Sequence, residues 1–281
     1  MDKFLLNDKK QISWSEYGSP FGIPVFYFHG TPGSNIEASS ADIIANELGV
    51  RLIAPDRPGY NESDVQDGFS LLDWANVIKQ LADNLNIHKF SIIGYSAGGP
   101  YALACAHEIP DRINHIALIS SMASFESSAM QTHINASFKP LYELAVTDLP
   151  ATIQQVSQLA NTVDSLQEAL SAELPSVDLS VIQDKNFKTI FHENLTVSLK
   201  NGVYGIVNDL HNIAQPWQFD AQLIDHKIDI WHGNDDLTVG PAVGGYLNDI
   251  LQDTDIHLLD NEGHFLMFSH WVDILRSIKN N

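Results

Sequence analysis

The fold is indicated by the stretch Phe90-Ser91-Ile92-Ile93-Gly94-Tyr95-Ser96-Ala97-Gly98. Its apolar beginning predicts a buried strand, and residues 97–107, which come just before Pro110, predict a helix. A serine at a sharp strand-to-helix turn must adopt a strained backbone conformation, and its neighbours must be small because strand and helix approach closely. Such a turn lifts the serine hydroxyl above the sheet and places it at a helix N-terminus, where developing negative charge is favoured.

Short apolar runs alternate with helical patterns on either side of this stretch. Ser70 opens one of the helices, with Asp73 three residues later as the partner of a capping box. The strands are expected at residues 25–28, 51–54, 90–93, 116–119, 228–231 and 256–259, and the other helices at residues 41–48, 97–107 and 265–278. This alternation predicts an α/β fold: a mostly parallel sheet with helices on both faces.

Strand-like runs nearly vanish between residues 124 and 212, where helical patterns are punctuated by prolines. We therefore expect an α/β core formed by residues 1–123 and 213–281, interrupted by a helical cap at residues 124–212. One face of a cap helix carries apolar side chains at helical spacing, namely Phe187, Ile190, Phe191, Leu195 and Leu199. Part of that face is expected to roof an apolar pocket above Ser96, with the remainder packing inside the cap.

A serine hydroxyl needs a general base to act as a nucleophile. His264 is the candidate, because it lies between the last predicted strand and the closing helix, at the sheet edge where ligands gather. The acid that orients the histidine should follow the preceding strand, and Asp235 and Asp236 both stand there. Adjacent side chains point in different directions, so one of the two is expected to fill this role. Asp236 is preferred and Asp235 is the alternative.

A glycine-bearing loop, His29-Gly30-Thr31-Pro32-Gly33, follows the strand predicted at residues 25–28. The backbone N–H of Thr31, together with that of Ala97, is expected to form an oxyanion hole that stabilises negative charge on the substrate. His29 is interpreted as a residue that braces the loop.

Composition narrows the classes of partner. The 281 residues carry a formal net charge of −20, which would repel nucleic acid and anionic membrane surfaces. A single cysteine, Cys105, cannot form an internal disulfide. No apolar run reaches the length of about 18 residues needed for a membrane span, and the first residues lack a signal-peptide pattern. We expect a cytoplasmic protein with a small-molecule substrate. We expect no cofactor and no metal, because phosphate-loop, dinucleotide and zinc motifs are lacking.

The sequence resembles the α/β-hydrolase superfamily, in the serine-nucleophile branch with a helical cap after the sixth strand. The matching residues are His29 to Gly33, Asp56-Arg57-Pro58-Gly59-Tyr60, Gly94 to Gly98, His232-Gly233 with Asp236 and Val239, and Gly263-His264. This resemblance implies that residues 56–60 form a structural turn near the site. It disfavours haloalkane dehalogenases and epoxide hydrolases, which use aspartate where this chain has Ser96.

The sequence therefore predicts a serine hydrolase that cleaves a small ester-like substrate through an acyl-enzyme, with carboxylesterase as the first choice. Thioesterase, lactonase, carbon–carbon bond hydrolase, aminopeptidase and acyltransferase activities stay open on the same fold, as does a slow ligand-binding receptor. The loop reads HGTPG rather than the HGGPG usual in proline iminopeptidases, which disfavours that group. The natural substrate and the oligomeric state are left open.

Overall fold

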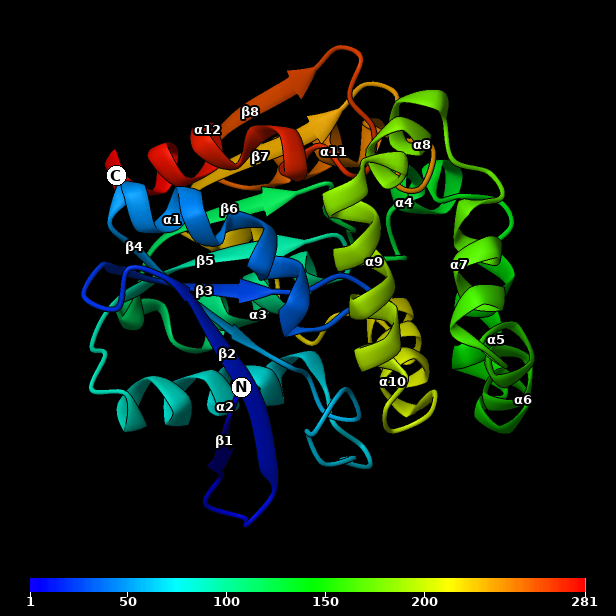
Figure 1. Ribbon diagram of the computed structural model, residues 1–281, viewed down its shortest axis with the longest axis horizontal. Coiled ribbons are helices and arrows are strands. Elements are labelled where there is room, and N and C mark those ends of the chain that lie inside the picture. Colours follow the sequence, from blue (N-terminus) through cyan, green and yellow to red (C-terminus); the bar gives the residue numbers. More distant parts are fainter. Residues whose placement is uncertain (281) are drawn as a thin grey trace.

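The stretch around Ser96 forms strand β5 (Phe90–Tyr95) near the middle of an eight-stranded sheet (Figure 1). The computed structural model describes residues 1–280. The strand order is β1-β2-β4-β3-β5-β6-β7-β8. The remaining strands are β1 (Asp2–Leu5), β2 (Gln11–Gly18), β3 (Ile23–Phe28), β4 (Val50–Pro55), β6 (Ile113–Ile119), β7 (Lys227–Gly233) and β8 (Asp253–Leu259). All six predicted strands are therefore confirmed.

Two strands at the N-terminus were missed by the sequence analysis. β1 pairs antiparallel with β2, and β2 pairs antiparallel with β4, whereas all pairs from β4 to β8 are parallel. The apolar–polar alternation of Ile12, Ser13, Trp14 and Ser15 could have indicated β2. Such alternation normally marks a strand with one exposed face, but here all four side chains are buried. The predicted α/β class with a mostly parallel sheet is confirmed.

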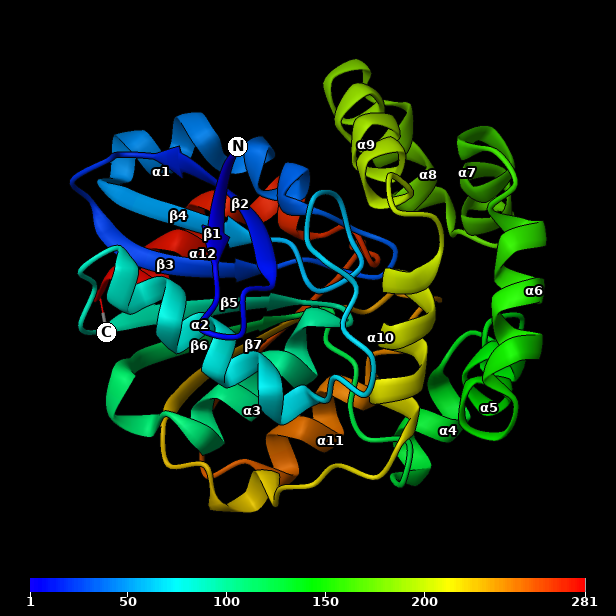
Figure 2. The ribbon, with the colours of Figure 1, turned by 90° about the horizontal axis from the view of Figure 1, so that it is seen from below.

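Helices cover both faces of the sheet, as Figures 1 and 2 show. One face is covered by α1 (Asp42–Leu48) and α12 (Met267–Asn280), and the other by α2 (Leu71–Asn84), α3 (Gly98–Glu108) and α11 (Ala242–Ile250). Successive residues of β3 enter different layers: Val25 and Tyr27 join the first, and Phe26 and Phe28 the second. A strand buried on both faces is apolar throughout, which explains the continuous apolar runs in the sequence.

The predicted start of α2 is confirmed in detail. Ser70 Oγ accepts the backbone N–H of Asp73 at 3.3 Å, and the Asp73 carboxylate accepts the N–H of Ser70 at 2.8 Å. This capping box satisfies N–H groups that the first turn of a helix leaves without partners.

The chain between β6 and β7 is helical and lies beyond the carboxyl ends of the parallel strands, at the right of Figure 1. Its helices are α4 (Ser128–His133), α5 (Lys139–Thr147), α6 (Leu149–Leu159), α7 (Val163–Ser171), α8 (Ser176–Gln183), α9 (Lys185–Ser198) and α10 (Tyr204–Ala214). The helical content predicted for residues 124–212 is confirmed, although α10 continues to Ala214. The division of the chain into two domains stays a prediction.

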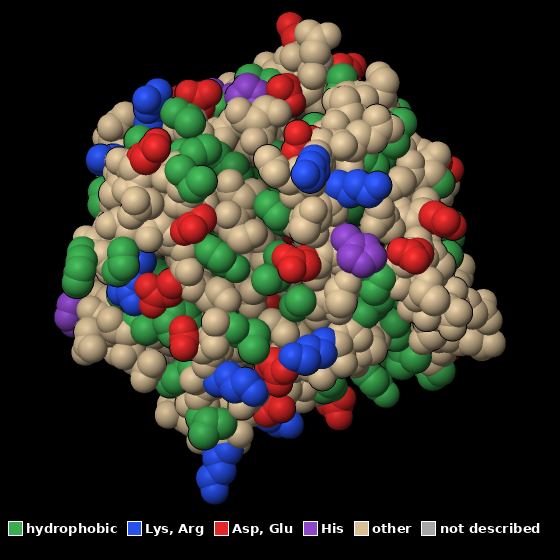
Figure 3. All heavy atoms as spheres, viewed as in Figure 1, with side chains coloured by type: hydrophobic (Ala, Val, Ile, Leu, Met, Phe, Trp, Pro, Cys, Tyr) green, Lys and Arg blue, Asp and Glu red, His purple; other side chains and the backbone are tan. Residues whose placement is uncertain are grey.

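Charged side chains of both signs are interspersed over the face drawn in Figure 3, and acidic groups do not gather in one patch there. Among residues 1–280, none of the helices combines the length and apolar content that crossing a membrane requires.

Candidate active site

Ser96 occupies the turn between β5 and α3 with a backbone φ of 52°. Its N–H donates to the carbonyl of Ile119 at 2.9 Å, and its carbonyl accepts the N–H of Met122 at 3.1 Å. A positive φ is unfavourable for a residue with a side chain and persists only where neighbouring structure enforces it. Here the hydrogen bonds to the last residue of β6 and to the chain after it enforce the strained turn that the sequence predicts.

The glycines beside Ser96 are required by close packing. A Cβ added to Gly94 would lie 2.8 Å from the carbonyl oxygen of Gly98 and 2.9 Å from the Cα of Gly99. A Cβ added to Gly98 would collide with the carbonyl of Phe28 in β3. Strand β5, helix α3 and strand β3 can therefore meet at this point only if these positions lack side chains.

His264 follows β8 and reaches back to the serine. Its Nε2 lies 3.0 Å from Ser96 Oγ, and its Nδ1 lies 2.8 Å from Asp236 Oδ2. An ionised carboxylate can only accept, so the Nδ1 of a neutral ring carries the proton and Nε2 is left to accept from the serine. The structure thus brings together Ser96, His264 and Asp236.

Asp236 lies in the turn after β7 and is 2% exposed, whereas Asp235 is exposed. Asp236 Oδ1 accepts the N–H groups of Thr238 at 2.8 Å and Val239 at 2.9 Å, which leaves Oδ2 for His264. His232 Nε2 also lies 3.3 Å from Asp236 Oδ2 and 2.7 Å from the Val239 carbonyl. Of the two aspartates that the sequence offers, the structure places Asp236 beside the histidine.

The charges of this site stabilise a positive imidazole beside a negative carboxylate. Burial lowers the pKa of His264, but the charge and hydrogen bond of Asp236, with the charges of Asp178 and Glu37, outweigh burial and raise the pKa above its ordinary value. Burial likewise raises the pKa of Asp236, but the charges and hydrogen bonds of His264 and His232 outweigh it and hold the pKa below its usual range.

Asp178 is a residue of this site that the sequence analysis missed. It lies in the first turn of α8 with 1% exposure, and its carboxylate accepts the backbone N–H groups of His264 at 2.9 Å and Phe265 at 3.0 Å. A side chain at Gly263 would collide with that carboxylate. The loop that carries His264 is therefore held by a helix between β6 and β7. No local pattern marked Asp178, because its partners lie 86 and 87 residues away.

Thr31 and Ala97 border the serine from two sides. Ala97 is the N-cap of α3, and Thr31 lies in the loop after β3. A Cβ built on Gly30 would lie 3.6 Å from the Cβ of Ser96, so this loop runs beside the serine. Within residues 1–280, neither the N–H of Thr31 nor that of Ala97 donates to a protein acceptor, so both are available to a ligand. His29 braces the loop: its Nδ1 lies 2.8 Å from the Gly30 carbonyl and its Nε2 accepts the N–H of Arg57.

A cavity of about 140 Å³ opens beside Ser96 and His264. Helices between β6 and β7 supply much of its lining, and these side chains are mainly apolar: Phe138, Leu141, Tyr142, Val156, Leu159, Leu166, Leu170, Phe187, Ile190, Phe191, Ile206 and Leu210. Of the five residues predicted to share a helix face, Phe187, Ile190 and Phe191 in α9 line the cavity, whereas Leu195 and Leu199, which follows the last residue of α9, do not. Among the described residues that line it, none is a lysine or arginine.

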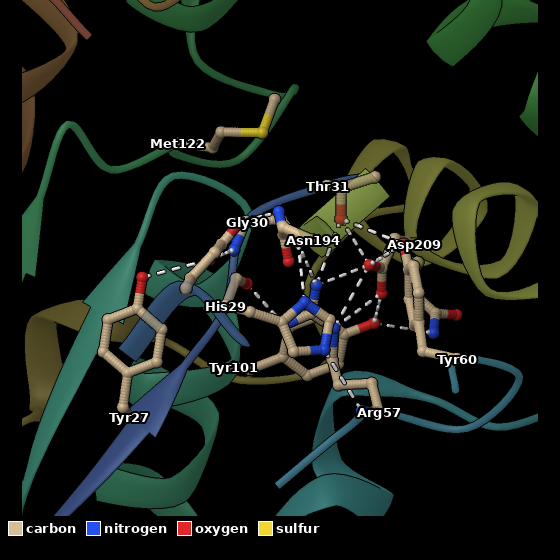
Figure 4. Close-up of polar contacts among 12 residues, drawn as sticks. Tyr27, His29, Gly30, Thr31, Arg57, Tyr60, Tyr101, Met122, Asn194 and Asp209 are labelled. Carbon is tan, nitrogen blue, oxygen red and sulfur yellow. Dashed lines mark hydrogen bonds and ion pairs between the residues drawn. The ribbon is translucent and has the colours of Figure 1, made fainter. Parts of the chain in front are cut away.

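Glu37 also borders the cavity, and the structure gives it three donors. Its Oε2 accepts the N–H of Gly30 at 2.9 Å and the hydroxyl of Tyr27 at 3.0 Å, and its Oε1 accepts Asn194 Nδ2 at 3.0 Å. Burial raises the pKa of Glu37 to about 7. The three donor residues, Tyr27, Gly30 and Asn194, are labelled in Figure 4. With its oxygens occupied by the protein, Glu37 braces the Gly30 loop.

No cluster of three or more His, Cys, Asp or Glu side chains suited to a metal ion occurs within residues 1–280. The Ser96 hydroxyl, His264 and Asp236 form one hydrogen-bonded chain, an arrangement that is capable of acid–base and nucleophilic chemistry.

Comparisons with known proteins agree with the fold. A family model described as alpha/beta hydrolase fold matches residues 23–270. The uncharacterized hydrolase YcgS of Bacillus subtilis (strain 168) is 24% identical over 76% of this chain and 78% of its own length. The 2-hydroxy-6-oxo-6-phenylhexa-2,4-dienoate hydrolase of Burkholderia cepacia is 26% identical over 89% of this chain and 84% of its own length. An esterase structure from Exiguobacterium antarcticum covers 99% of both chains with a TM-score of 0.72 and 17% identity, which supports the fold alone.

Proposed function

The chain belongs to the α/β-hydrolase fold family, and on that premise we propose that it is a serine hydrolase that cleaves an uncharged, ester-like substrate with an apolar acyl group. The observation that carries this proposal is the hydrogen-bonded chain from Asp236 through His264 to Ser96, which opens on an apolar cavity without basic side chains.

The proposed mechanism uses Ser96 Oγ as the nucleophile. Oγ attacks the carbonyl carbon while His264 Nε2 takes its proton, and the N–H groups of Thr31 and Ala97 stabilise the oxyanion that forms. Collapse of this intermediate breaks the bond to the alcohol, which leaves with the proton from His264. Water then attacks the acyl-enzyme and gives a proton to the same nitrogen. Collapse of this second intermediate breaks the bond to Ser96 Oγ, which takes the proton back from His264, and the acid is released. Asp236 holds the ring and stabilises its charged form throughout.

We propose that residues 124–212 act as a lid that shapes the acyl pocket. Phe187, Ile190 and Phe191, on one face of α9, line the cavity. This supports the expectation that the segment roofs an apolar pocket above Ser96. Apolar walls favour an apolar acyl group, because a charged group would lose its hydration without a counter-charge to replace it. The name of the relative from Burkholderia cepacia gives its substrate as a dienoate, which is an anion. Such an anion would find no lysine or arginine partner in the lining of this cavity.

The rate of hydrolysis is expected to rise with acyl chain length. For p-nitrophenyl esters from acetate upward, each methylene that the cavity buries can add about 0.8 kcal/mol, or up to about fourfold in kcat/KM, until the cavity is full. An ester of similar length that ends in a carboxylate should be hydrolysed more slowly.

Two variants of α9 make this measurement specific. Ile190→Ala enlarges the cavity and should shift the preferred chain length upward. Leu199→Ala removes a half-buried side chain just past the end of the same helix and outside the cavity, and should leave the preferred chain length unchanged. Preference for the carboxylate-bearing ester, or equal shifts in both variants, would contradict an apolar acyl site in this cavity.

Activity is expected to fall on the acid side as His264 becomes protonated, because only the neutral ring can accept the Ser96 proton. The groups that act electrostatically on the ring are Asp236, Asp178 and Glu37. The negative charge of Asp178 raises the pKa of His264, so Asp178→Asn should move the acid limb of kcat/KM to lower pH. The measurement is kcat/KM on one ester from about pH 5 to 9 in the parent and in this variant.

Asp235→Asn is the matched control for this pH profile. It removes one negative charge from the exposed neighbour of Asp236 and should leave the acid limb where it is in the parent enzyme. An acid limb that stays in place or moves to higher pH in Asp178→Asn would refute the electrostatic role given to Asp178.

A further inference from the structure

The loop that bears Thr31 is fixed by a buried ionic network, which Figure 4 shows. Arg57, from the loop after β4, is 1% exposed. Its Nη1 donates to the carbonyl of His29 at 2.6 Å, and its Nη2 donates to the carbonyl of Gly30 at 2.8 Å. The guanidinium therefore spans two consecutive carbonyls of the loop that runs beside Ser96.

The Gly30 carbonyl belongs to the same peptide unit as the N–H of Thr31. A peptide unit is planar, and its C=O and N–H point in opposite directions, so a donor that fixes the carbonyl also fixes the direction of the N–H. His29 contributes a second donor, since its Nε2 accepts the N–H of Arg57 and its Nδ1, 2.8 Å from the Gly30 oxygen, carries the proton. A positive group on the carbonyl also polarises the peptide and strengthens its N–H as a donor.

Asp209 of α10 holds Arg57 in this position. Its carboxylate, also 1% exposed, accepts Arg57 Nη2 at 2.6 Å and Nε at 3.0 Å. The same carboxylate accepts the hydroxyls of Tyr60 at 2.8 Å and Tyr101 at 2.7 Å, as well as the hydroxyl of Thr31 itself. Asp209 thus contacts Thr31 directly and also acts on it through Arg57.

We propose that Arg57, held by Asp209, is a positioning residue for the oxyanion donor: it fixes and polarises the peptide whose Thr31 N–H stabilises the transition state. The inference rests on the function proposed above. A buried ion pair is a poor source of net stability, because removing both charges from water costs about as much as their attraction returns. Such a network beside Ser96 is explained by its effect on the Thr31 N–H, whose direction it fixes. An oxyanion hole is effective only when its donors are oriented before the reaction.

The test compares Arg57→Lys and Asp209→Asn with Asp229→Asn. The last variant removes the same charge from a different buried pair, in which Asp229 Oδ2 lies 2.9 Å from His115 Nε2 and neither residue lines the cavity. Rates on a p-nitrophenyl ester are normalised to the sites that a fluorophosphonate titrates, so that molecules that fail to fold are not counted. Affinity is measured for an alkyl trifluoromethyl ketone, whose carbonyl adds the serine oxygen and places a negative oxygen in the oxyanion site.

We expect kcat to fall about 10- to 100-fold in Arg57→Lys and Asp209→Asn with little change in KM, because a misoriented donor should cost less than the loss of about 100- to 1000-fold typical of removing one oxyanion donor. Affinity for the ketone should fall by a similar factor. Asp229→Asn should lower the melting temperature with little change in kcat per titrated site. A purely structural network would lower stability in all three variants and leave kcat per titrated site intact, and that result would overturn the inference.

Failure of the inference can be told apart from failure of the proposed function. If the parent enzyme is neither titrated by the fluorophosphonate nor inhibited by the ketone, Ser96 is not the nucleophile and the proposed function fails. If the parent is titrated and inhibited, but Arg57→Lys keeps the parental kcat and ketone affinity, the positioning role of Arg57 alone is refuted.

Discussion

Ser96→Ala is expected to reduce kcat by about 10⁴- to 10⁶-fold, as loss of the nucleophile does in serine hydrolases. The Ser96 hydroxyl is held 3.0 Å from His264 Nε2 at a strained turn. Among the described residues, no other hydroxyl lies within hydrogen-bond distance of this nitrogen. The variant retains the cavity and the proposed oxyanion donors, so binding of substrate should survive while the covalent step is lost. The change is measured as hydrolysis of the best p-nitrophenyl ester under saturating conditions.

Labelling gives this prediction an independent readout. A fluorophosphonate forms a covalent bond with an activated serine, so the parent should gain one adduct, and peptide mapping should place it on residue 96. The control is Ser121→Ala, which changes another buried serine whose hydroxyl donates to the Met122 carbonyl, and which should keep the adduct. Equal labelling of the parent and of Ser96→Ala would remove Ser96 from the mechanism.

The sequence predicted those parts of the site that short segments determine. The strand-to-helix turn at Ser96 needs small residues at positions 94 and 98 for steric reasons that involve only a few neighbours. The structure shows the close contacts that exclude side chains there. The position of His264 follows from the order of strands and helices, because the loops after parallel strands meet at one edge. The sequence favoured Asp236 over Asp235 but could not assign the role. The choice depends on the backbone turn after β7, which directs Asp236 Oδ2 toward the His264 ring.

The residues that were missed act across long separations. Asp178 meets the N–H of His264 across 86 residues, Asp209 meets Arg57 across 152, and Asn194 meets Glu37 across 157. Each pair joins a helix between β6 and β7 to a residue in a segment that follows a strand of the sheet, and no local pattern encodes such a pairing. The strand at residues 11–18 was missed for another reason. Ser13 looks polar in the sequence, yet it is buried, because its hydroxyl donates a hydrogen bond to Asp56.

These long-range contacts also change the expectation for the segment between β6 and β7. α8, α9 and α10 each bring one buried polar side chain to a segment at the sheet edge near Ser96. Asp178 contacts the His264 loop, Asn194 contacts Glu37 in the short 3-10 helix Asn35–Ala41, and Asp209 contacts Arg57 and Thr31. Removing the helices would leave buried groups such as Arg57 without a counter-charge, which is costly. The segment is therefore part of the framework that holds the site as well as the wall of its cavity.

Asp236→Asn is expected to lower kcat by about 10⁴-fold, the loss seen when the aspartate of a serine–histidine–aspartate triad becomes an amide. The structure supplies a specific reason. The N–H groups of Thr238 and Val239 both donate to Oδ1, so an amide at position 236 must place its oxygen there. Its NH₂ group then faces His264 Nδ1 in place of Oδ2. The ring can meet that donor only by moving its proton to Nε2, where it can no longer accept the proton of Ser96.

Asp235→Asn is the matched comparison, because it makes the same chemical change at the adjacent, exposed residue. Its kcat should stay within about twofold of the parent, as exposed substitutions without specific contacts rarely matter. Both variants are compared at saturating ester, with melting temperatures to verify folding and fluorophosphonate labelling rates to report the reactivity of Ser96 directly. Asp236→Asn should label far more slowly than the parent, since the histidine no longer activates the serine. The reverse ranking, with both variants folded, would transfer the orienting role to Asp235 and would require a turn after β7 different from the one that places Asp236 Oδ2 2.8 Å from His264 Nδ1.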